Sequence, residues 1–244
     1  MKNLTKSTII LSFLSFLTFF TSANADIKVV ASIKPIHSLA SYLMDGVAKP
    51  DLIVDGYASP HGFALKPSHA KMLQNADIVF WVGEDLENFL EKPLSSIAKK
   101  AEKIELLEVK GLVKLKFRER NIFDDHEDHD DHAKKEDGHD DHDGHEGHNH
   151  GEFDPHIWLD PINAKVILFE MSKHLIENDP SNETAYRANL SKAYKEIDKL
   201  TKDVTAELNE STASIVFHDA YQYFEKRFNV NILGAFTVNT DVMP

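Results

Sequence analysis

Histidine is the residue type in this sequence best placed to do chemistry. The chain has 14 histidines and no cysteine. Eight of them are interleaved with aspartates in one acidic stretch: His126, His129, His132, His139, His142, His145, His148 and His150. Imidazole nitrogens and carboxylate oxygens are ligands that Zn²⁺ accepts. Nothing in this stretch could form a packed core, so we interpret it as a solvated, auxiliary low-affinity zinc site. A solvated spacer is the alternative.

Three further histidines, His61, His156 and His218, lie in sequence typical of folded structure on both sides of that stretch. His61 and His218 each follow a predicted strand, where open α/β sheets place their ligand crevices. His156 lies on a loop just before a predicted helix. Three imidazoles can bind one tetrahedral ion at about 2.0–2.1 Å and leave a fourth position for a carboxylate or water. We predict that these three form a metal site, the alternative for each being a structural, hydrogen-bonded histidine.

The remaining histidines and the motifs of common enzymes carry less information. We expect His37, His69 and His174, which fall within predicted helices, to be structural or surface residues. The sequence has no glycine-rich phosphate loop, no serine or cysteine nucleophile elbow, and no His-Glu-x-x-His pair. Asp219 could orient an imidazole, but we favour it as the N-cap of the helix that follows.

Short apolar strands alternate with helices in the first half of the chain. This alternation predicts a parallel sheet covered on both faces. The predicted strands are residues 27–33, 51–56, 78–83 and 104–107. The predicted helices are residues 34–44, 67–75 and 86–100, the first with Pro35 at its first helical position.

The second half is predicted to contain long helices and then a further α/β unit. Asp160-Pro161 and Asp179-Pro180 each have the form of an N-cap followed by a proline. After the second, apolar residues recur every three or four positions from Tyr186 to Leu208, which predicts a long amphipathic helix bracing two domains; coiled-coil pairing is the alternative. Two strands and a helix are predicted after it: residues 214–217, 230–236 and 219–228.

The beginning of the chain indicates export. A basic start, an apolar stretch from Ile9 to Phe20 and the small residues around Ala25 are typical of a signal peptide over residues 1–25, with an uncleaved anchor as the alternative. The formal net charge is −13, and most of the negative charge lies in the histidine-rich stretch. The rest of the chain is nearly neutral, which argues against a nucleic-acid partner. We therefore predict a periplasmic protein.

Four segments together resemble a known family. They are residues 59–68 (SPHGFALKPS), 81–87 (WVGEDLE), 154–161 (DPHIWLDP) and 217–224 (FHDAYQYF). They are similar to the zinc-binding periplasmic proteins of bacterial ABC importers, the ZnuA-like members of the metal solute-binding proteins. The resemblance covers the whole mature chain and implies two α/β lobes joined by a long rigid helix, with metal held between them.

The resemblance also implies a set of site residues and a domain division. His61, His156 and His218 match the family's three histidine ligands, and the histidine at the third position favours zinc over manganese. The expected parts are the signal peptide 1–25, an α/β lobe 26–120, a disordered His-rich loop 121–152, a helical region 153–210, and the start of a second α/β lobe 211–244. The family usually continues further, so this second lobe is expected to be incomplete.

The function implied is a receptor, not an enzyme. We expect a monomer that captures Zn²⁺ and delivers it to the membrane permease of an ABC importer. A zinc hydrolase with a water on a three-histidine metal is one alternative, although no segment offers an obvious general base. A periplasmic metal buffer or adhesin is another.

Overall fold

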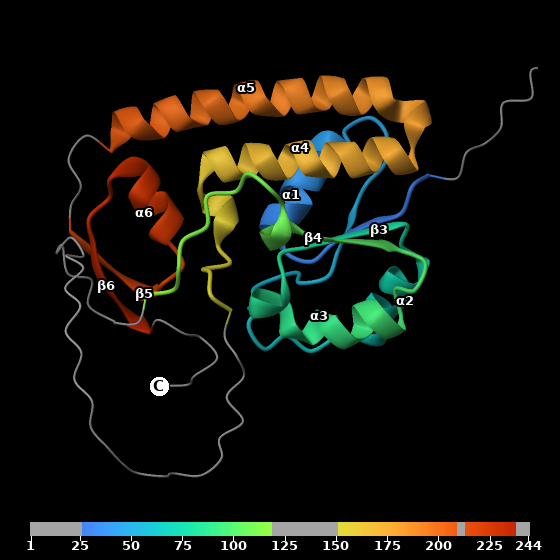
Figure 1. Cartoon of the computed structure of the whole chain (residues 1–244), viewed down its shortest axis with the longest axis horizontal. Helices are drawn as coiled ribbons and strands as arrows, with labels where there is room; N and C mark the ends of the chain where they lie inside the picture. The colour runs from blue at the N-terminus through green and yellow to red at the C-terminus, as the bar shows by residue number, and fades with distance from the viewer. Residues whose placement is uncertain (1–25, 119–150, 209–212, 238–244) are drawn as a thin grey trace, which may run out of the picture.

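The computed structural model describes residues 26–118, 151–208 and 213–237 (Figure 1). The predicted signal peptide, the eight histidines of the His-rich loop and the last seven residues lie outside the described residues. Among the described residues, no helix combines the length and the apolar character needed to cross a membrane.

The first half of the chain forms a four-stranded parallel sheet in the order β2-β1-β3-β4. The strands are β1 (Val29–Ala31), β2 (Asp51–Leu52), β3 (Ile78–Trp81) and β4 (Glu102–Glu105). Every residue of the two central strands, β1 and β3, is buried. Their continuous apolar sequences follow from this, because helices cover both faces of a parallel sheet.

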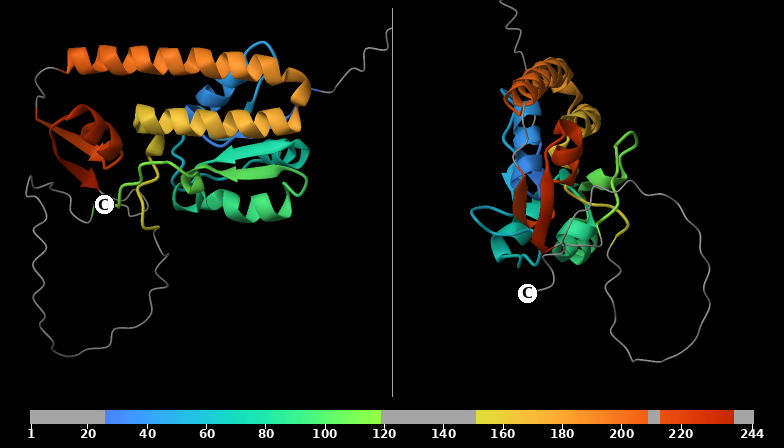
Figure 2. Two further views of the ribbon diagram at one scale, coloured as in Figure 1. Left: turned by 45° about the horizontal axis from the view of Figure 1, so that its top comes forward. Right: turned by 90° about the vertical axis from the view of Figure 1, so that its left-hand side faces the viewer.

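Helices make these two covering layers, as Figures 1 and 2 show. On one side lie α2 (Pro67–Asn75) and α3 (Glu84–Ser96), and on the other α1 (Lys34–Leu43) and α4 (Pro161–Asn178). Pro35 lies in the first turn of α1, and Pro161 begins α4, where Asp160 caps the helix by accepting the Ile162 N–H at 2.8 Å. Proline is well suited to these positions because the first-turn N–H has no helical partner.

The long helix α5 (Glu183–Glu207) packs against α4 and α1 and runs back toward the second sheet (Figure 1). Its 25 residues correspond to about 37 Å. Tyr186, fully buried, and Asn189, which donates to the Leu43 carbonyl at 2.8 Å, fix it to the first half. The predicted cap at Asp179 was wrong in detail. Its carboxylate accepts from Ser181, Asn182 and Tyr186 across a 3₁₀ turn, and α5 begins only at Glu183.

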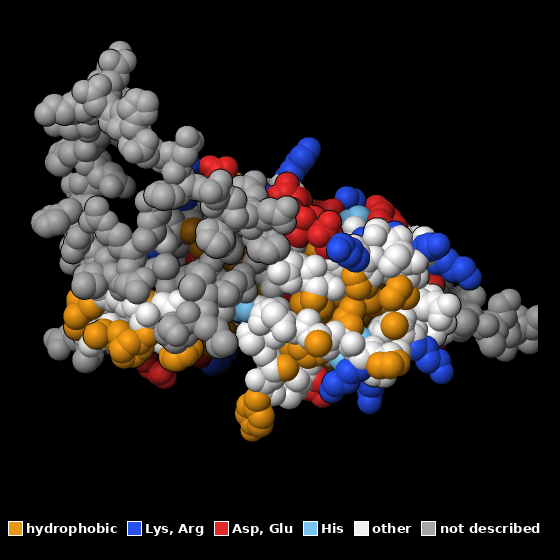
Figure 3. Space-filling model, turned by 90° about the horizontal axis from the view of Figure 1, so that it is seen from below, with side chains coloured by type: hydrophobic (Ala, Val, Ile, Leu, Met, Phe, Trp, Pro, Cys, Tyr) orange, Lys and Arg blue, Asp and Glu red, His pale blue; other side chains and the backbone are white. Residues whose placement is uncertain are grey.

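After α5 the chain forms two parallel strands, β5 (Ser214–His218) and β6 (Ile232–Thr237), connected through α6 (Gln222–Phe228). Apolar side chains gather at this end of the molecule, toward the left of Figure 3. On the two strands, the large exposed ones are Ile215, Phe217, Leu233 and Phe236. This small sheet therefore presents apolar surface that the described residues leave exposed.

The predicted fold class is confirmed: parallel sheets flanked by helices, with one long helix leading from the first to the second. Several element bounds differ from the prediction; strand β1, for example, has three residues instead of seven. Strand β2 has two residues instead of six, because the chain already bends at Ile53 and Val54. Strand β4 begins at Glu102, and Leu106–Glu108 form a 3₁₀ turn. Asp219 is not an N-cap, because α6 begins three residues later, at Gln222.

Candidate metal centre

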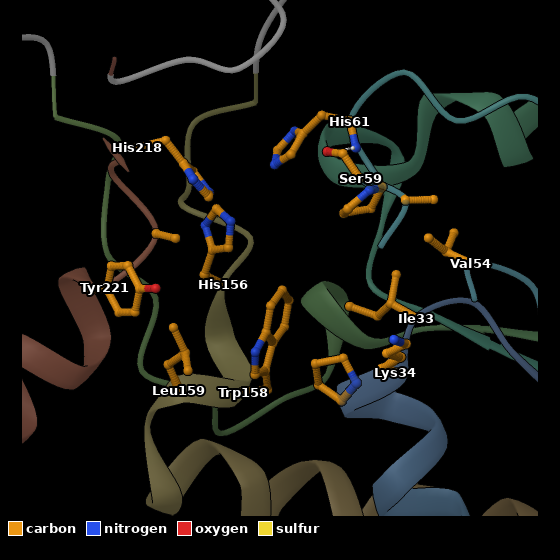
Figure 4. Close-up of a pocket in the computed structure, with 14 residues that line it drawn as sticks. Ile33, Lys34, Val54, Ser59, His61, His156, Trp158, Leu159, His218 and Tyr221 are labelled. Atoms are coloured by element: carbon orange, nitrogen blue, oxygen red, sulfur yellow. Dashed lines mark hydrogen bonds between the residues drawn. The ribbon is translucent and has the colours of Figure 1, made fainter. Parts of the chain in front are cut away.

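Three histidine rings from distant segments lie together between the two halves of the chain (Figure 4). The ring centroids of His61 and His156 are 5.8 Å apart, those of His61 and His218 are 5.9 Å apart, and those of His156 and His218 are 5.5 Å apart. One ring nitrogen from each lies within 4.8 Å of the others. In a tetrahedral zinc site, nitrogens about 2.0–2.1 Å from the ion are about 3.4 Å from one another. A modest inward movement of the side chains would therefore produce ligand geometry.

The rings line a pocket of about 420 Å³ to which both halves of the chain contribute. Ile33 and the loop around His61 form one wall, while Trp158 and Tyr221 belong to the other (Figure 4). The Trp158 ring lies edge-on to the His156 ring, and the two ring centroids are 5.4 Å apart. Mostly apolar walls with a few convergent nitrogens are typical of a site that binds a small ligand away from bulk water.

His156 is held by a carboxylate two residues before it. It precedes the 3₁₀ turn η2 (Ile157–Leu159), and its Nδ1 lies 2.7 Å from the Asp154 Oδ1, which also accepts the His156 backbone N–H at 2.9 Å. Both side chains are buried. Since a carboxylate oxygen only accepts, Nδ1 carries the proton and Nε2 keeps its lone pair for a metal. The sequence prediction missed Asp154, although its spacing in Asp-Pro-His was a usable signal.

His218 is the last residue of β5 and points into the pocket (Figure 4). Burial lowers the pKa of its imidazole, and the nearby His156 lowers it further, because two neighbouring imidazoles resist being protonated together, while Asp154 acts in the opposite direction. A neutral imidazole at neutral pH is the form that binds metal.

Asp219, the residue after His218, forms an ion pair with Arg118, because its carboxylate lies 3.5 Å from the Arg118 guanidinium. Burial raises the pKa of Asp219 to about 6, and Arg118 opposes that rise.

His61 comes from the loop between β2 and α2. Its backbone N–H donates to the Ser59 hydroxyl at 3.2 Å, and Gly62 beside it has a φ of +78°. That left-handed conformation is accessible to glycine without strain. The turn Ser59-Pro60-His61-Gly62 therefore directs the His61 ring toward the two histidines of the second half.

Polar contacts fix the second half around the other two histidines. The Tyr223 hydroxyl donates to the Asp154 carbonyl at 2.8 Å and accepts the Leu115 N–H at 3.0 Å. The Arg227 guanidinium makes a bidentate contact with the Asp160 carboxylate, and both N···O distances are 2.7 Å. These contacts tie α6 to the segment that carries His156, so His156 and His218 belong to one connected unit.

The three other histidines among the described residues, His37, His69 and His174, do not line this pocket. The His37 Nε2 is 3.0 Å from the Pro50 carbonyl oxygen. The His69 Nδ1 accepts the Lys66 N–H at 3.2 Å and caps α2. His174 lies on α4 among three glutamates. The interpretation of the His-rich loop concerns residues beyond those described.

Solved structures share this architecture. The Zn(II)-bound ZnuA-like domain of Streptococcus pneumoniae AdcA aligns with a TM-score of 0.64 at 17% identity, over 88% of this chain and 68% of that one. A Mn-bound periplasmic metal binding protein from Candidatus Liberibacter asiaticus aligns with a TM-score of 0.67 at 18% identity, over 89% of this chain and 71% of that one. These alignments show that the chain shares its fold with both proteins.

Sequence similarity is more specific. The chain is 46% identical to the high-affinity zinc uptake system protein ZnuA of Brucella abortus, over 100% of this chain and 77% of that protein. The family model described as zinc-uptake complex component A, periplasmic, matches residues 29–244. The resemblance seen in the sequence motifs is confirmed by both comparisons, and the chain belongs to this family of periplasmic zinc-uptake components.

Proposed function

We propose that this protein is a periplasmic receptor that binds one Zn²⁺ with high affinity through His61, His156 and His218. The observation that carries this proposal is the convergence of the three imidazoles in a pocket between the two halves of the chain. The support is chemical as well as geometric. His156 has its tautomer set by Asp154, and burial favours the neutral form of His218.

The donor set favours zinc over manganese. Three imidazoles form a borderline-soft site, which suits Zn²⁺, whereas Mn²⁺ suits carboxylate and carbonyl oxygens. A water molecule or a carboxylate completes the tetrahedron in this proposal. Binding to Zn²⁺ should therefore exceed binding to Mn²⁺ by orders of magnitude.

We further propose that the protein delivers the ion to the permease of an ABC importer, and membership of the uptake family supports this. The family component is periplasmic, and a cleavable signal peptide over residues 1–25 is the proposed means of export. We propose a monomer built from an α/β lobe (26–120), a helical region (153–210) and a second α/β lobe beginning at residue 211. The end of β5 and the residues Ala220 and Tyr221 that follow it supply part of the second wall of the binding pocket.

The His-rich loop is proposed as an auxiliary, weaker zinc site. Its eight histidines and many acidic residues supply donors, but its composition gives no fixed geometry. Replacing all eight histidines with asparagine should remove weak zinc binding and leave the tight site intact. If the number of zinc ions bound per chain does not change after this replacement, the loop is only a spacer.

The central experiment is a zinc titration of the full chain by competition with a chelator of known affinity. His61→Ala and His218→Ala should each remove the tight site, because two imidazoles hold zinc far more weakly than three. His37→Ala is the matched control, since that ring contacts a backbone carbonyl outside the pocket. Retention of one tight site in the doubly substituted protein would refute the proposal.

A further inference from the structure

A second group of metal-ligand side chains lies on the sheet side of α4, away from the pocket. It contains His174 and Glu177 of α4 and Glu102 at the beginning of β4. One ligand atom from each lies within 4.8 Å of the others. His174 lies about 20 Å along the helix from Asp160, which caps α4 beside the pocket. The group is thus separate from the three-histidine centre.

The imidazole of His174 has a carboxylate at both of its nitrogens. Its Nδ1 lies 2.9 Å from the Glu102 Oε1 and 3.8 Å from the Glu177 Oε2, and its Nε2 lies 3.1 Å from the Glu170 Oε1. A neutral imidazole has one N–H, so it can donate to only one of these sides. The other side needs either a second proton or a cation between the ring nitrogen and the carboxylates.

The surroundings distinguish the two sides of the ring. Lys173 lies 3.0 Å from Glu170, so the carboxylate at Nε2 already has a cationic partner. Around Nδ1, the Glu102 Oε2 accepts from the Asn178 amide at 2.7 Å, which orients this carboxylate. Glu177 is half exposed and free to turn toward a bound ion. Glu102 and Glu177 together leave two negative charges facing the Nδ1 lone pair.

We infer that this group is a second divalent-cation site that takes Zn²⁺ or an ion of similar ligand preference. His174 Nδ1, Glu102 and Glu177 are the ligands, and water fills the remaining positions. Glu170 is a positioning residue: by accepting the Nε2 proton it fixes the tautomer and aims Nδ1 at the ion. The bound ion links the beginning of β4 to the last turns of α4. The inference does not depend on zinc binding in the three-histidine pocket.

Histidine-selective ¹⁵N NMR of the full chain tests the inference, because it reports on the His174 ring whatever happens at other histidines. His174→Gln assigns the resonance. Titration with zinc beyond the amount taken up by the pocket and the His-rich loop should move the His174 Nδ1 signal, saturably, to the position of a metal-bound nitrogen. Glu177→Gln and Glu102→Gln should each raise the zinc concentration at half-saturation tenfold or more.

Glu183→Gln is the matched control, because Glu183 is a half-exposed glutamate in an i,i+4 ion pair on another helix. It should leave the His174 titration unchanged. A His174 signal that does not move up to millimolar zinc would overturn the inference. So would a doubly protonated His174 at neutral pH whether or not zinc is present, or an equal zinc response in Glu177→Gln. Because Glu177 is a half-exposed side chain, its substitution tests the site without unfolding the protein.

Discussion

The Nδ1 of His156 and the carboxylate of Asp154 form a buried contact of 2.7 Å, between residues separated by one proline. The contact fixes which imidazole nitrogen is presented to the pocket. It also connects the pocket to α6, because Gln222 donates to the other Asp154 oxygen at 3.3 Å.

Asp154→Asn should weaken zinc binding by about 10- to 100-fold, the usual effect of losing a carboxylate that orients a ligating histidine. The asparagine amide has a donor group, which can pair with Nδ1 and favour the wrong tautomer. Competition with a fluorescent zinc chelator measures the change. Asp203→Asn on α5, an exposed member of an i,i+4 pair, is the control and should bind zinc normally. Normal affinity in Asp154→Asn would contradict the role given to this carboxylate.

Zinc affinity should fall as the pH falls. Protons and the metal compete for the same imidazole nitrogens, so binding weakens once the histidines begin to protonate. Because burial lowers the pKa of His218 below its ordinary value of 6.5, protonation of this ring begins to compete only in acidic solution. Affinity should be nearly constant between about pH 7 and pH 8 and then fall by up to about tenfold per pH unit for each competing proton. Chelator competition at a series of pH values checks this, and stronger binding in acid would disprove it.

Glu87 should make the free energy of unfolding depend on pH. Its carboxyl is fully buried in α3, and burial raises its pKa from 4.5 to about 7, although the Val82 and Gly83 N–H groups, which donate to it at 2.8 and 3.1 Å, oppose the rise. Between these two pKa values the folded state binds a proton that the unfolded state does not. The contribution of Glu87 to stability is therefore full below about pH 4.5, decreases as the pH rises to about 7, and then stays constant.

Glu87→Gln removes this titration and keeps an oxygen that can accept both N–H groups. The stability of the parent protein relative to the variant should therefore drop by about 3 kcal/mol at most between pH 4.5 and 7. Urea unfolding of both proteins at several pH values measures the difference, in which the effects of all other titrating groups cancel. A difference that does not vary with pH would show that Glu87 titrates normally.

Arg227 should contribute to stability through Asp160. Asp160 is buried and caps α4, and its carboxylate accepts two hydrogen bonds from the Arg227 guanidinium. Arg227→Met leaves that carboxylate without its cation, and such a loss costs about 3–5 kcal/mol for a fully buried pair. Because Arg227 is one-third exposed, we expect a smaller loss, about 2 kcal/mol. A double-mutant cycle with Asp160→Asn, measured by thermal unfolding, isolates the interaction energy of the two side chains. If the stability losses of the two single variants simply add in the double variant, the two side chains are not directly coupled.

Much of the fold could be predicted from local signals in the sequence. The uninterrupted apolar run of β3 indicated a buried parallel strand, and the Asp160-Pro161 pair marked the start of α4. The periodic apolar positions after Tyr186 predicted α5. Each of these signals is contained within a few turns or one strand, so neighbouring residues were sufficient to read it.

What the sequence could not provide were partners distant along the chain. Asp219 was predicted to be a helix cap because a polar residue before a helix usually is one, but Arg118 instead draws its carboxylate into an ion pair. His174 was assigned to the structural or surface group, and its contact with Glu102 is visible only once β4 lies beside α4. The convergence of His61, His156 and His218 was predictable only as a hypothesis from strand ends and family resemblance.

The wide separation of these three histidines along the chain determines when their pocket can exist. The loop after β2 supplies the first ring early, but the third arrives only at the end of β5, after the whole of α5. A nascent or partly unfolded chain thus presents imidazoles singly, with no chelating effect between them. Occupancy of the pocket consequently reports that the two halves have assembled, and any opening that detaches β5 dismantles it.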